Sequence, residues 1–250
     1  LLTEADRFDN LTIHFNKECT NVDLDTNTVF FKDTTNNEEF SISSDVIFGT
    51  DGAGSELRKS YFLQRKFLFS FSQNFLTHGY KELEIPASAE GNHQISKDYL
   101  HIWPRGQYML IALPNPDRSF TCTLFLPFEG KNSFENLLTK EDVFQFFQKT
   151  FKDALPLMPS LEEDFFNNPA SSLCLIRCFP WTYKDKVALI GDAAHAIVPF
   201  YGQGMNASFE DVAVLDGIID KNEGDWETIF KTYQSFRKAN ADAIGDLAEE

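Results

Sequence analysis

The sequence predicts an α/β fold, α+β overall, in which an antiparallel sheet is inserted into an α/β domain. Two short and wholly apolar runs, at residues 46–48 and 187–190, each end in a glycine-containing turn that opens a helix. Such runs are typical of parallel strands that are covered on both faces. Between them, residues 100–126 form alternating segments separated by turn signals, which predicts an antiparallel meander.

The first segment contains short strands and one helix. Residues 11–15 and 28–31 are predicted strands, and Asn36, Asn37 and the glutamates that follow indicate a turn before the next strand. The apolar run at residues 46–48 is followed by a helix over residues 55–61.

The middle segment changes character. A hairpin is predicted from strands at residues 100–103 and 108–113, flanking a turn at residues 104–107, with a further strand at residues 120–126. Thr139 and Asp142 resemble a capping box, and the helix behind them places Val143, Phe147 and Phe151 on one face. A short helix and a strand at residues 173–178 follow.

The last segment returns to the buried parallel type of strand at residues 186–190. The helix after Gly204 carries one apolar stripe, made of Met205, Phe209, Val212, Leu215 and Ile219. A final helix, capped by Asp225, is expected to turn Trp226, Ile229, Tyr233 and Phe236 inward. We therefore expect domains at residues 1–63, 64–180 and 181–250, with the outer two joined in space.

Composition excludes several classes of function. The net charge of −16 without a basic run argues against binding nucleic acid or an anionic membrane surface. No apolar stretch approaches the roughly 20 residues that a membrane-spanning helix needs, and we expect no signal peptide. Four scattered cysteines lack metal-ligand spacing, which predicts reduced thiols, no metal and a cytoplasmic protein. The 26 phenylalanines predict an aromatic-rich core or pocket.

The turn at Gly191 and Asp192 is the first candidate site. An acid at the end of a parallel strand can accept hydrogen bonds from a sugar-like diol, and two alanines let the backbone approach a ligand. Taken without the residues that follow it, Asp192 is also explained as an ordinary N-cap of a helix. His195 stands three residues further on, but no second ligand accompanies it, so a structural position near a cofactor is the better interpretation.

The loop at residues 199–206 is the second candidate. Gly202 and Gly204 allow main-chain N–H groups to approach a planar ring, and the positive end of the following helix favours negative charge there. Pro199 and Phe200 would form an apolar wall. A third candidate is the turn at Asp51 and Gly52, where backbone donors could face a pyrophosphate and Arg58 could add charge or pair with a nearby acid.

The meander offers a further apolar surface. Alternation places Met109, Ile111 and Leu113 on one side of their strand and Thr121, Thr123 and Phe125 on one side of theirs. A flat aromatic ring would suit such a surface, and core packing explains the same pattern.

Several strings together resemble the FAD-dependent aromatic hydroxylases: GTDGAGSELR, HGYKELEIP, LHIWPR, MLIALPN, SFTCTLFLP and LIGDAAHAIVPFYGQGMNASFED. The resemblance implies a Rossmann-like FAD-binding domain with an inserted substrate domain. It also implies FAD, NADPH as a transient co-substrate, molecular oxygen and a flavin C4a-hydroperoxide. LHIWPR and VPFYGQGMNA are most similar to the branch that hydroxylates L-kynurenine to 3-hydroxykynurenine, a step of tryptophan degradation.

The resemblance also implies the site residues. The expected cofactor-binding residues are Asp51, Gly52, Arg58, Gly191, Asp192, Pro199, Gly202, Gln203, Gly204, Met205 and Asn206. The expected substrate-binding residues are Leu100, Met109, Leu113, Thr123, Phe125, Pro199, Phe200 and Tyr201. Asp192 would bind the ribityl chain, the Asp51 turn would lie near the pyrophosphate, and no catalytic residue is assigned.

The chain departs from the family in two respects. It lacks the opening GxGxxG motif that holds the ADP part of FAD, and it lacks the flanking residues that grip the substrate's amino-acid group. We therefore expect a fragment that binds FAD poorly and turns over nothing by itself; a homodimer is a possible assembly of the protein. The alternatives are a flavin hydroxylase for another ring, a halogenase, whose WxWxIP string is absent, and a non-catalytic module with the same fold.

Overall fold

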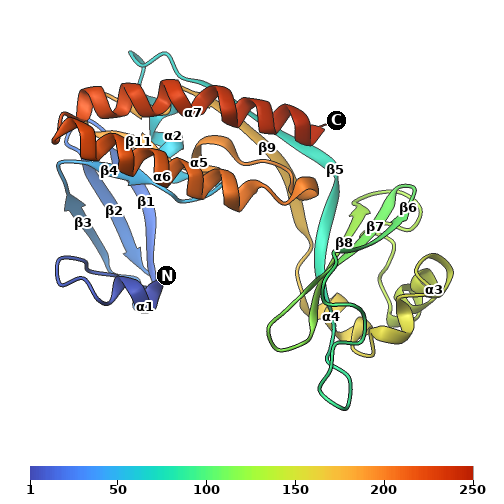
Figure 1. Cartoon of the computed structure of the whole chain (residues 1–250). Helices are drawn as coiled ribbons and strands as arrows, with labels where there is room; N and C mark the ends of the chain where they lie inside the picture. The colour runs from blue at the N-terminus through green and yellow to red at the C-terminus, as the bar shows by residue number, and fades with distance from the viewer. Residues whose placement is uncertain (250) are drawn as a thin grey trace. The chain divides into compact units, whose positions relative to one another are not determined.

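The structure is a computed structural model that describes residues 1–249, and all side chains among them except those of Tyr201 and Glu249. The chain divides into two compact units, which are described separately (Figure 1). Unit 1 consists of Leu1–Asn74 and Cys174–Glu250, and unit 2 of Phe75–Leu173. We expected boundaries after residues 63 and 180. The observed division falls inside two long strands, β5 (Ser70–Ile85) and β9 (Ser171–Phe179).

Unit 1 begins with a short helix, α1 (Leu2–Ala5), and an antiparallel sheet of order β1-β2-β3. Its strands are β1 (Lys17–Asp23), β2 (Thr28–Asp33) and β3 (Glu39–Ser43). The strand predicted at residues 11–15 is wrong: these residues have no regular structure, and Leu11, Ile13 and Phe15 are exposed. Their alternating pattern has no neighbouring strand to pair with.

A second sheet in unit 1 has the order β10-β11-β4, with strands β10 (Thr182–Tyr183), β11 (Val187–Leu189) and β4 (Ile47–Gly49). β11 and β4 are parallel, with Leu189 opposite Gly49. The main-chain N–H of Ile190 continues the pairing by donating to the oxygen of Gly49 over 2.9 Å. Residues far apart in the sequence therefore end their strands at the same edge of this sheet.

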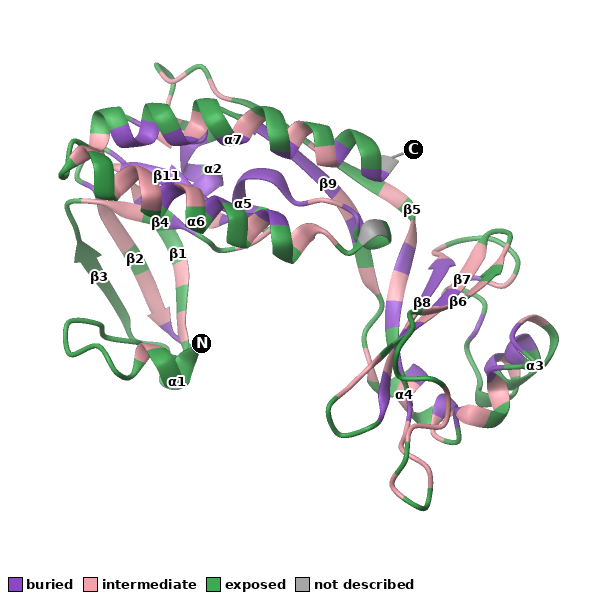
Figure 2. Cartoon of the chain, in the orientation of Figure 1, coloured by how far each residue is buried: buried purple, intermediate pink, exposed green. Residues whose placement is uncertain are grey.

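Helices complete unit 1: α2 (Glu56–Leu63), α5 (Asp192–His195), the 3₁₀ turn η2 (Pro199–Tyr201), α6 (Gly204–Asn222) and α7 (Trp226–Glu249). α6 and α7 contact each other along their lengths (Figure 1). β11 and most of α5 are buried, whereas α6 and α7 expose their outer faces (Figure 2). The core of the unit joins Trp181, Tyr61, Phe230 and Tyr233 to β11.

The predicted apolar stripes of the last two helices are only partly buried. Leu215 is buried, but Met205, Phe209 and Val212 are 68%, 50% and 50% exposed. On α7, Ile229 and Tyr233 are buried as expected, while Phe236 is 60% exposed. The chain buries Arg237, the residue after Phe236, because that guanidinium finds partners on α6.

Unit 2 is built on an antiparallel sheet. The sheet order is β6-β7-β8-β5-β9, with β6 (His101–Arg105), β7 (Tyr108–Pro114) and β8 (Phe120–Pro127). The hairpin turn is shorter than predicted, because Pro104 and Arg105 continue β6. A proline is tolerated there since β6 is an edge strand.

One face of this sheet carries the core of unit 2. Leu110, Ala112, Cys122 and Leu124 are fully buried and belong to the same cluster as Phe147. The covering elements are α3 (Lys140–Thr150), the 3₁₀ turn η1 (Leu155–Leu157) and α4 (Leu161–Asn167). The capping box at Thr139 and Asp142 is confirmed.

Candidate cofactor site

Two turns lie side by side at the carboxyl edge of the β11–β4 pair. The turn at Asp51 and Gly52 follows β4, and the turn at Gly191 and Asp192 follows β11. Because these strands are parallel and in register, both turns leave the sheet at the same edge. This edge is where ligands collect in α/β sheets.

The Asp51 turn is organised around the start of α2. The Oδ2 atom of Asp51 accepts hydrogen bonds from the main-chain N–H groups of Glu56 (2.8 Å) and Leu57 (3.2 Å). Gly52 has a φ of +76°, and a Cβ atom there would meet nothing within 4 Å. The turn therefore leaves open space beside a backbone that favours glycine.

Arg58 ties this turn to the second one. Its side chain is buried, its Nη1 donates to the main-chain oxygen of Ala193 over 2.7 Å, and its Nη2 donates to that of Ala53. Burial lowers the pKa of Arg58. The sequence left open whether Arg58 pairs with an acid, and the structure directs these two nitrogens to main-chain carbonyls. Its contact with a cofactor stays a prediction.

Gly191 allows the second turn to lie close to α6. It has a φ of +61°, and a Cβ atom there would lie 2.9 Å from the Oγ of Ser208. Its N–H donates to the Oδ2 of Asp211 over 2.9 Å. Asp192, the first residue of α5, is exposed. Its carboxylate is therefore accessible to a ligand.

A cavity of about 440 Å³ lies between these turns and α6. It is lined by Thr50, Gly52, Ile190, Gly191, Asp192, Met205, Ser208, Phe209 and Val212. The structure thus brings together four of the predicted cofactor residues: Gly52, Gly191, Asp192 and Met205. The half-exposed apolar stripe of α6 forms one wall of this cavity.

The loop before α6 and the first turn of that helix supply five more of the predicted cofactor residues. Gly202 adopts the left-handed conformation, with a φ of +62°, and its N–H donates to the oxygen of Pro199. Gln203 is the N-cap of α6, and Asn206 donates to its side chain over 3.0 Å. The loop residues 199, 202, 203, 204 and 206 do not line the 440 Å³ cavity.

The predicted substrate residues of unit 2 share one face of its sheet. Met109 is opposite Phe125, Ile111 is opposite Thr123, and Leu113 is opposite Thr121. Leu113 and, just before β6, Leu100 are about half exposed, whereas Phe125 is buried. This face is the reverse of the one that carries the unit's core. Pro199 and Phe200 are exposed in unit 1, and the side chain of Tyr201 lies outside the described part.

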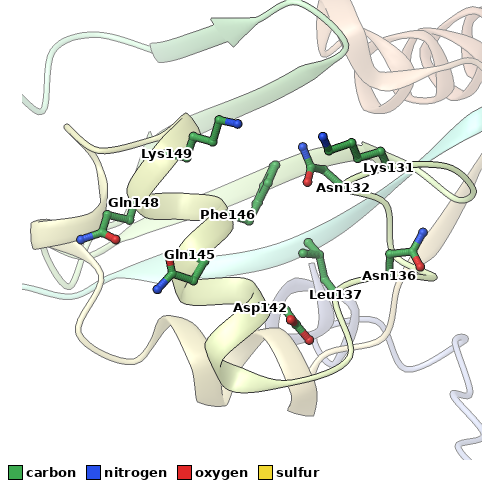
Figure 3. A pocket seen from close by; sticks show the side chains of 9 residues that line it. All are labelled: Lys131, Asn132, Asn136, Leu137, Asp142, Gln145, Phe146, Gln148 and Lys149. Atoms are coloured by element: carbon green, nitrogen blue, oxygen red, sulfur yellow. The ribbon is translucent and has the colours of Figure 1, made fainter.

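A larger hollow, of about 780 Å³, lies in unit 2 beside α3 (Figure 3). Polar side chains surround most of it, among them Lys131, Asn132, Gln145 and Lys149. It contains no residue predicted for the site. Size alone therefore does not locate the functional site in this chain.

Two buried residues near the Gly191 turn are not among the residues predicted from the sequence. Asp211 on α6 and Arg237 on α7 are fully buried and form an ion pair, with 2.7 Å between Oδ1 and Nε. His195, which the sequence did single out, binds the other oxygen of Asp211. A signal was present: Asp211 lies four residues before the buried Leu215, on the same helical face.

The chemistry of the cavity lining indicates the kind of ligand that it suits. Among residues 1–249, no group of three or more His, Cys, Asp or Glu side chains is arranged to hold an ion. The 440 Å³ cavity instead combines one exposed carboxylate, two glycines at positive φ and an apolar wall. These are features of a pocket for a small organic ligand.

Comparison with known proteins defines the class. The chain belongs to the FAD binding domain family, whose model matches residues 1–248. The solved structure of the tetrameric form of 2-methyl-3-hydroxypyridine-5-carboxylic acid oxygenase has a TM-score of 0.72 at 19% identity, covering 96% of this chain and 60% of that one. Klebsiella pneumoniae HpxO complexed with FAD and uric acid has a TM-score of 0.66 at 18% identity, covering 93% and 56%. These likenesses confirm the predicted fold.

The similar relatives are kynurenine 3-monooxygenases. The one from Flavobacterium johnsoniae is 59% identical over 204 residues, which are 82% of this chain and 45% of the relative. The one from Dictyostelium discoideum is 46% identical over 263 residues, covering 100% of this chain and 56% of the relative. The chain therefore spans about half the length of these relatives. In residues 1–249 no helix combines the length and apolarity that crossing a bilayer requires.

Proposed function

We propose that this chain supplies the cofactor-binding edge and the substrate sheet of an FAD-dependent ring hydroxylase that converts L-kynurenine to 3-hydroxykynurenine. NADPH and molecular oxygen are the proposed co-substrates. One observation carries the proposal: two turns from distant parts of the sequence lie at one sheet edge, beside a cavity that both of them line. The kynurenine 3-monooxygenase relatives support the choice of substrate.

The cofactor residues are proposed from this geometry. Asp192 is exposed at the rim of the cavity and accepts hydrogen bonds from the hydroxyls of the ribityl chain. Gly52 and Gly191 give the backbone a close approach to the cofactor, and Met205 packs against it. The predicted roles of Asp51, Arg58 and the loop residues 199–206 belong to the same proposal.

Bound flavin supplies the redox chemistry, taking electrons from NADPH and activating oxygen for the ring carbon beside the amino group of kynurenine. The chain's own tasks are electrostatic and steric. The N-terminus of α6, a helix of 19 residues, places positive partial charge near the loop at residues 199–206 and favours negative charge on a reduced ring. Met205, Phe209 and Val212 line the cavity with apolar surface, against which a bound ring would pack.

The substrate residues form two separate proposals. In unit 2, Leu100, Met109, Leu113, Thr123 and Phe125 are proposed to contact the aromatic ring, because their shared sheet face is apolar and partly exposed. In unit 1, Pro199, Phe200 and Tyr201 are proposed as substrate contacts. A cytoplasmic location and a homodimer remain predictions.

The deciding experiment is NADPH oxidation by the complete gene product, loaded with FAD, with and without L-kynurenine. We expect kynurenine to stimulate oxidation and 3-hydroxykynurenine to form in proportion to the NADPH consumed. Stimulation by 4-hydroxybenzoate or salicylate but not by kynurenine would assign a different ring hydroxylase. The 250-residue chain alone, assayed in parallel, is expected to retain little flavin.

A further inference from the structure

Three polar side chains are buried together behind the Gly191 turn. His195, Asp211 and Arg237 are 4%, 0% and 1% exposed, and they come from α5, α6 and α7 respectively. Burying charged groups is costly unless every one is paired. The hydrogen-bond and ion-pair partners of these three side chains therefore decide whether the cluster is stable in the core.

Asp211 is the centre of this cluster. Its Oδ2 atom accepts hydrogen bonds from the N–H of Gly191 (2.9 Å) and from Nε2 of His195 (2.5 Å). Its Oδ1 atom accepts one from Nε of Arg237 (2.7 Å). Since a carboxylate only accepts, Nε2 of His195 must carry a hydrogen. Three donors thus converge on two oxygens.

Arg237 extends the cluster to the start of α6. Its Nη2 donates to the main-chain oxygen of Ala207 over 3.3 Å. Its Nη1 lies 2.6 Å from a carboxylate oxygen of Glu210, an ion pair that lacks hydrogen-bond geometry. The indole of Trp181 packs on the ring of His195, with 5.0 Å between ring centroids. The cluster therefore joins the turn after β11 to the first turns of α6.

The cluster lies where two walls of the cofactor cavity meet. Gly191 and Asp192 line one side of the cavity, while Met205, Ser208 and Phe209 line the other. Ser208 also packs against the bare Cα of Gly191. Asp211 does not line the cavity itself, but its hydrogen bond to Gly191 connects the two walls from behind.

We propose that Asp211 is a positioning residue for the cofactor, holding the Gly191–Asp192 turn and the start of α6 in the arrangement that binds FAD, with His195 and Arg237 as its partners. This inference rests on the proposed function. If Asp211 has this role, a side chain of the same volume without the carboxylate should not support FAD binding equally well. In Asp211→Asn, the amide NH₂ faces Nε of Arg237 in one orientation, and both the N–H of Gly191 and Nε2 of His195 in the other, so at least one contact is lost.

The test measures the dissociation constant of FAD from the complete gene product by flavin fluorescence. We expect Asp211→Asn to raise this constant about ten-fold or more, as expected from the loss of a hydrogen bond to a charged group. The control is Tyr61→Phe, which removes a buried hydroxyl that donates to Trp181 and Val187, away from the carboxyl end of β11. It is expected to lower stability and leave FAD affinity within about two-fold of the wild type.

Hydrogen exchange provides a second reading that general destabilisation would not reproduce. In Asp211→Ala, which removes both acceptor oxygens, the amides of Gly191 and Asp192 should exchange faster than in the wild type. In Tyr61→Phe the same two amides should exchange at the wild-type rate. FAD affinity of Asp211→Asn within about two-fold of the wild type, or unchanged exchange at these amides in Asp211→Ala, overturns the inference.

A second pair of variants decides the matter if Asp211→Asn does not fold. His195→Gln retains a donor toward Asp211, whereas His195→Leu removes it. We expect near-normal FAD affinity for the first variant and a loss of about ten-fold for the second. Equal affinities would contradict the inference. If the wild type binds no FAD, the proposed function fails, and exchange at Gly191 still decides whether Asp211 holds the turn.

Discussion

Nη1 of Arg58 lies 2.7 Å from the main-chain oxygen of Ala193, a residue 135 positions further along the chain. The same guanidinium binds the oxygen of Ala53, so one side chain joins the turn after β4 to the helix after β11. Gly52 and Gly191, one from each of the two turns, line the 440 Å³ cavity. Arg58 therefore connects the two chain segments that border this cavity.

Replacing Arg58 should weaken the fold. In Arg58→Leu, two main-chain oxygens lose a charged donor, and we expect the free energy of unfolding to fall by about 2–4 kcal/mol. Lys59→Leu is the control: the exposed ion pair of Lys59 with Glu56 is worth well under about 1 kcal/mol. Urea unfolding followed by tryptophan fluorescence measures both, and equal losses would refute the role of Arg58.

Gly191 should tolerate no side chain. Gly191→Ala combines strain at a φ of +61° with a Cβ 2.9 Å from the Oγ of Ser208. We expect a loss of stability of about 2–4 kcal/mol from the backbone strain and the close contact together. The control is Gly224→Ala: at a φ of +87°, with nothing within 4 Å of the added Cβ, this substitution introduces backbone strain without a close contact. The prediction is wrong if the two substitutions cost the same.

Asp192 should contribute to FAD binding and little to stability. Its side chain is exposed at the cavity, so we expect Asp192→Ala to change the free energy of unfolding by less than about 0.5 kcal/mol. FAD affinity of the complete gene product should fall about ten-fold. Asp216→Ala, exposed on α6 and outside the cavity lining, should change neither quantity. Full flavin content in Asp192→Ala would remove its assigned role.

Leu113 lies on the sheet face of unit 2 that is proposed to contact the substrate. It is 48% exposed on the face that also carries Thr121, so truncation should disturb the fold little. We expect Leu113→Ala to raise the KM for kynurenine about ten-fold, because an apolar contact with the ring is lost, and to leave FAD affinity unchanged. Leu138→Ala removes a 70% exposed leucine outside this sheet. The same KM in both variants would exclude Leu113 from the substrate site.

The stabilisation contributed by Asp211 should depend on pH. Burial alone would raise the pKa of Asp211, but the hydrogen bond and charge of His195 and the hydrogen bond of Arg237 more than offset it, so the pKa is lowered. The folded state thus binds fewer protons than the unfolded state, whose carboxyl has a pKa near its ordinary value of about 4. The stabilisation is therefore full above that value and is lost as pH falls through the lower folded pKa.

Urea unfolding of the wild type and Asp211→Asn at about pH 7 and about pH 3 measures this effect. We expect the stability difference between the two proteins to be larger at the higher pH than at the lower one. A difference that stays constant with pH, or grows on acidification, would show that Asp211 is not ionised in the folded protein.

Most elements followed from local patterns. The apolar runs at residues 46–48 and 187–190 became a parallel pair because each is short, wholly apolar and followed by a glycine-containing turn. The capping box at Thr139 formed as its side chains dictate. The alternating residues 11–15 failed as a strand, since a strand needs a partner that no local pattern can specify.

Short-range sterics and hydrophobic periodicity set the two turns, their glycines and the acid after β11, and these features can be read from the residues in order. Packing between distant elements is what buries Arg237, exposes Phe236 and brings Asp211 to Gly191. Burial of a charge is stable only where partners from other elements saturate its hydrogen bonds. For Asp211, the partners Gly191 and Arg237 lie 20 and 26 residues away along the chain, so only folding brings them together.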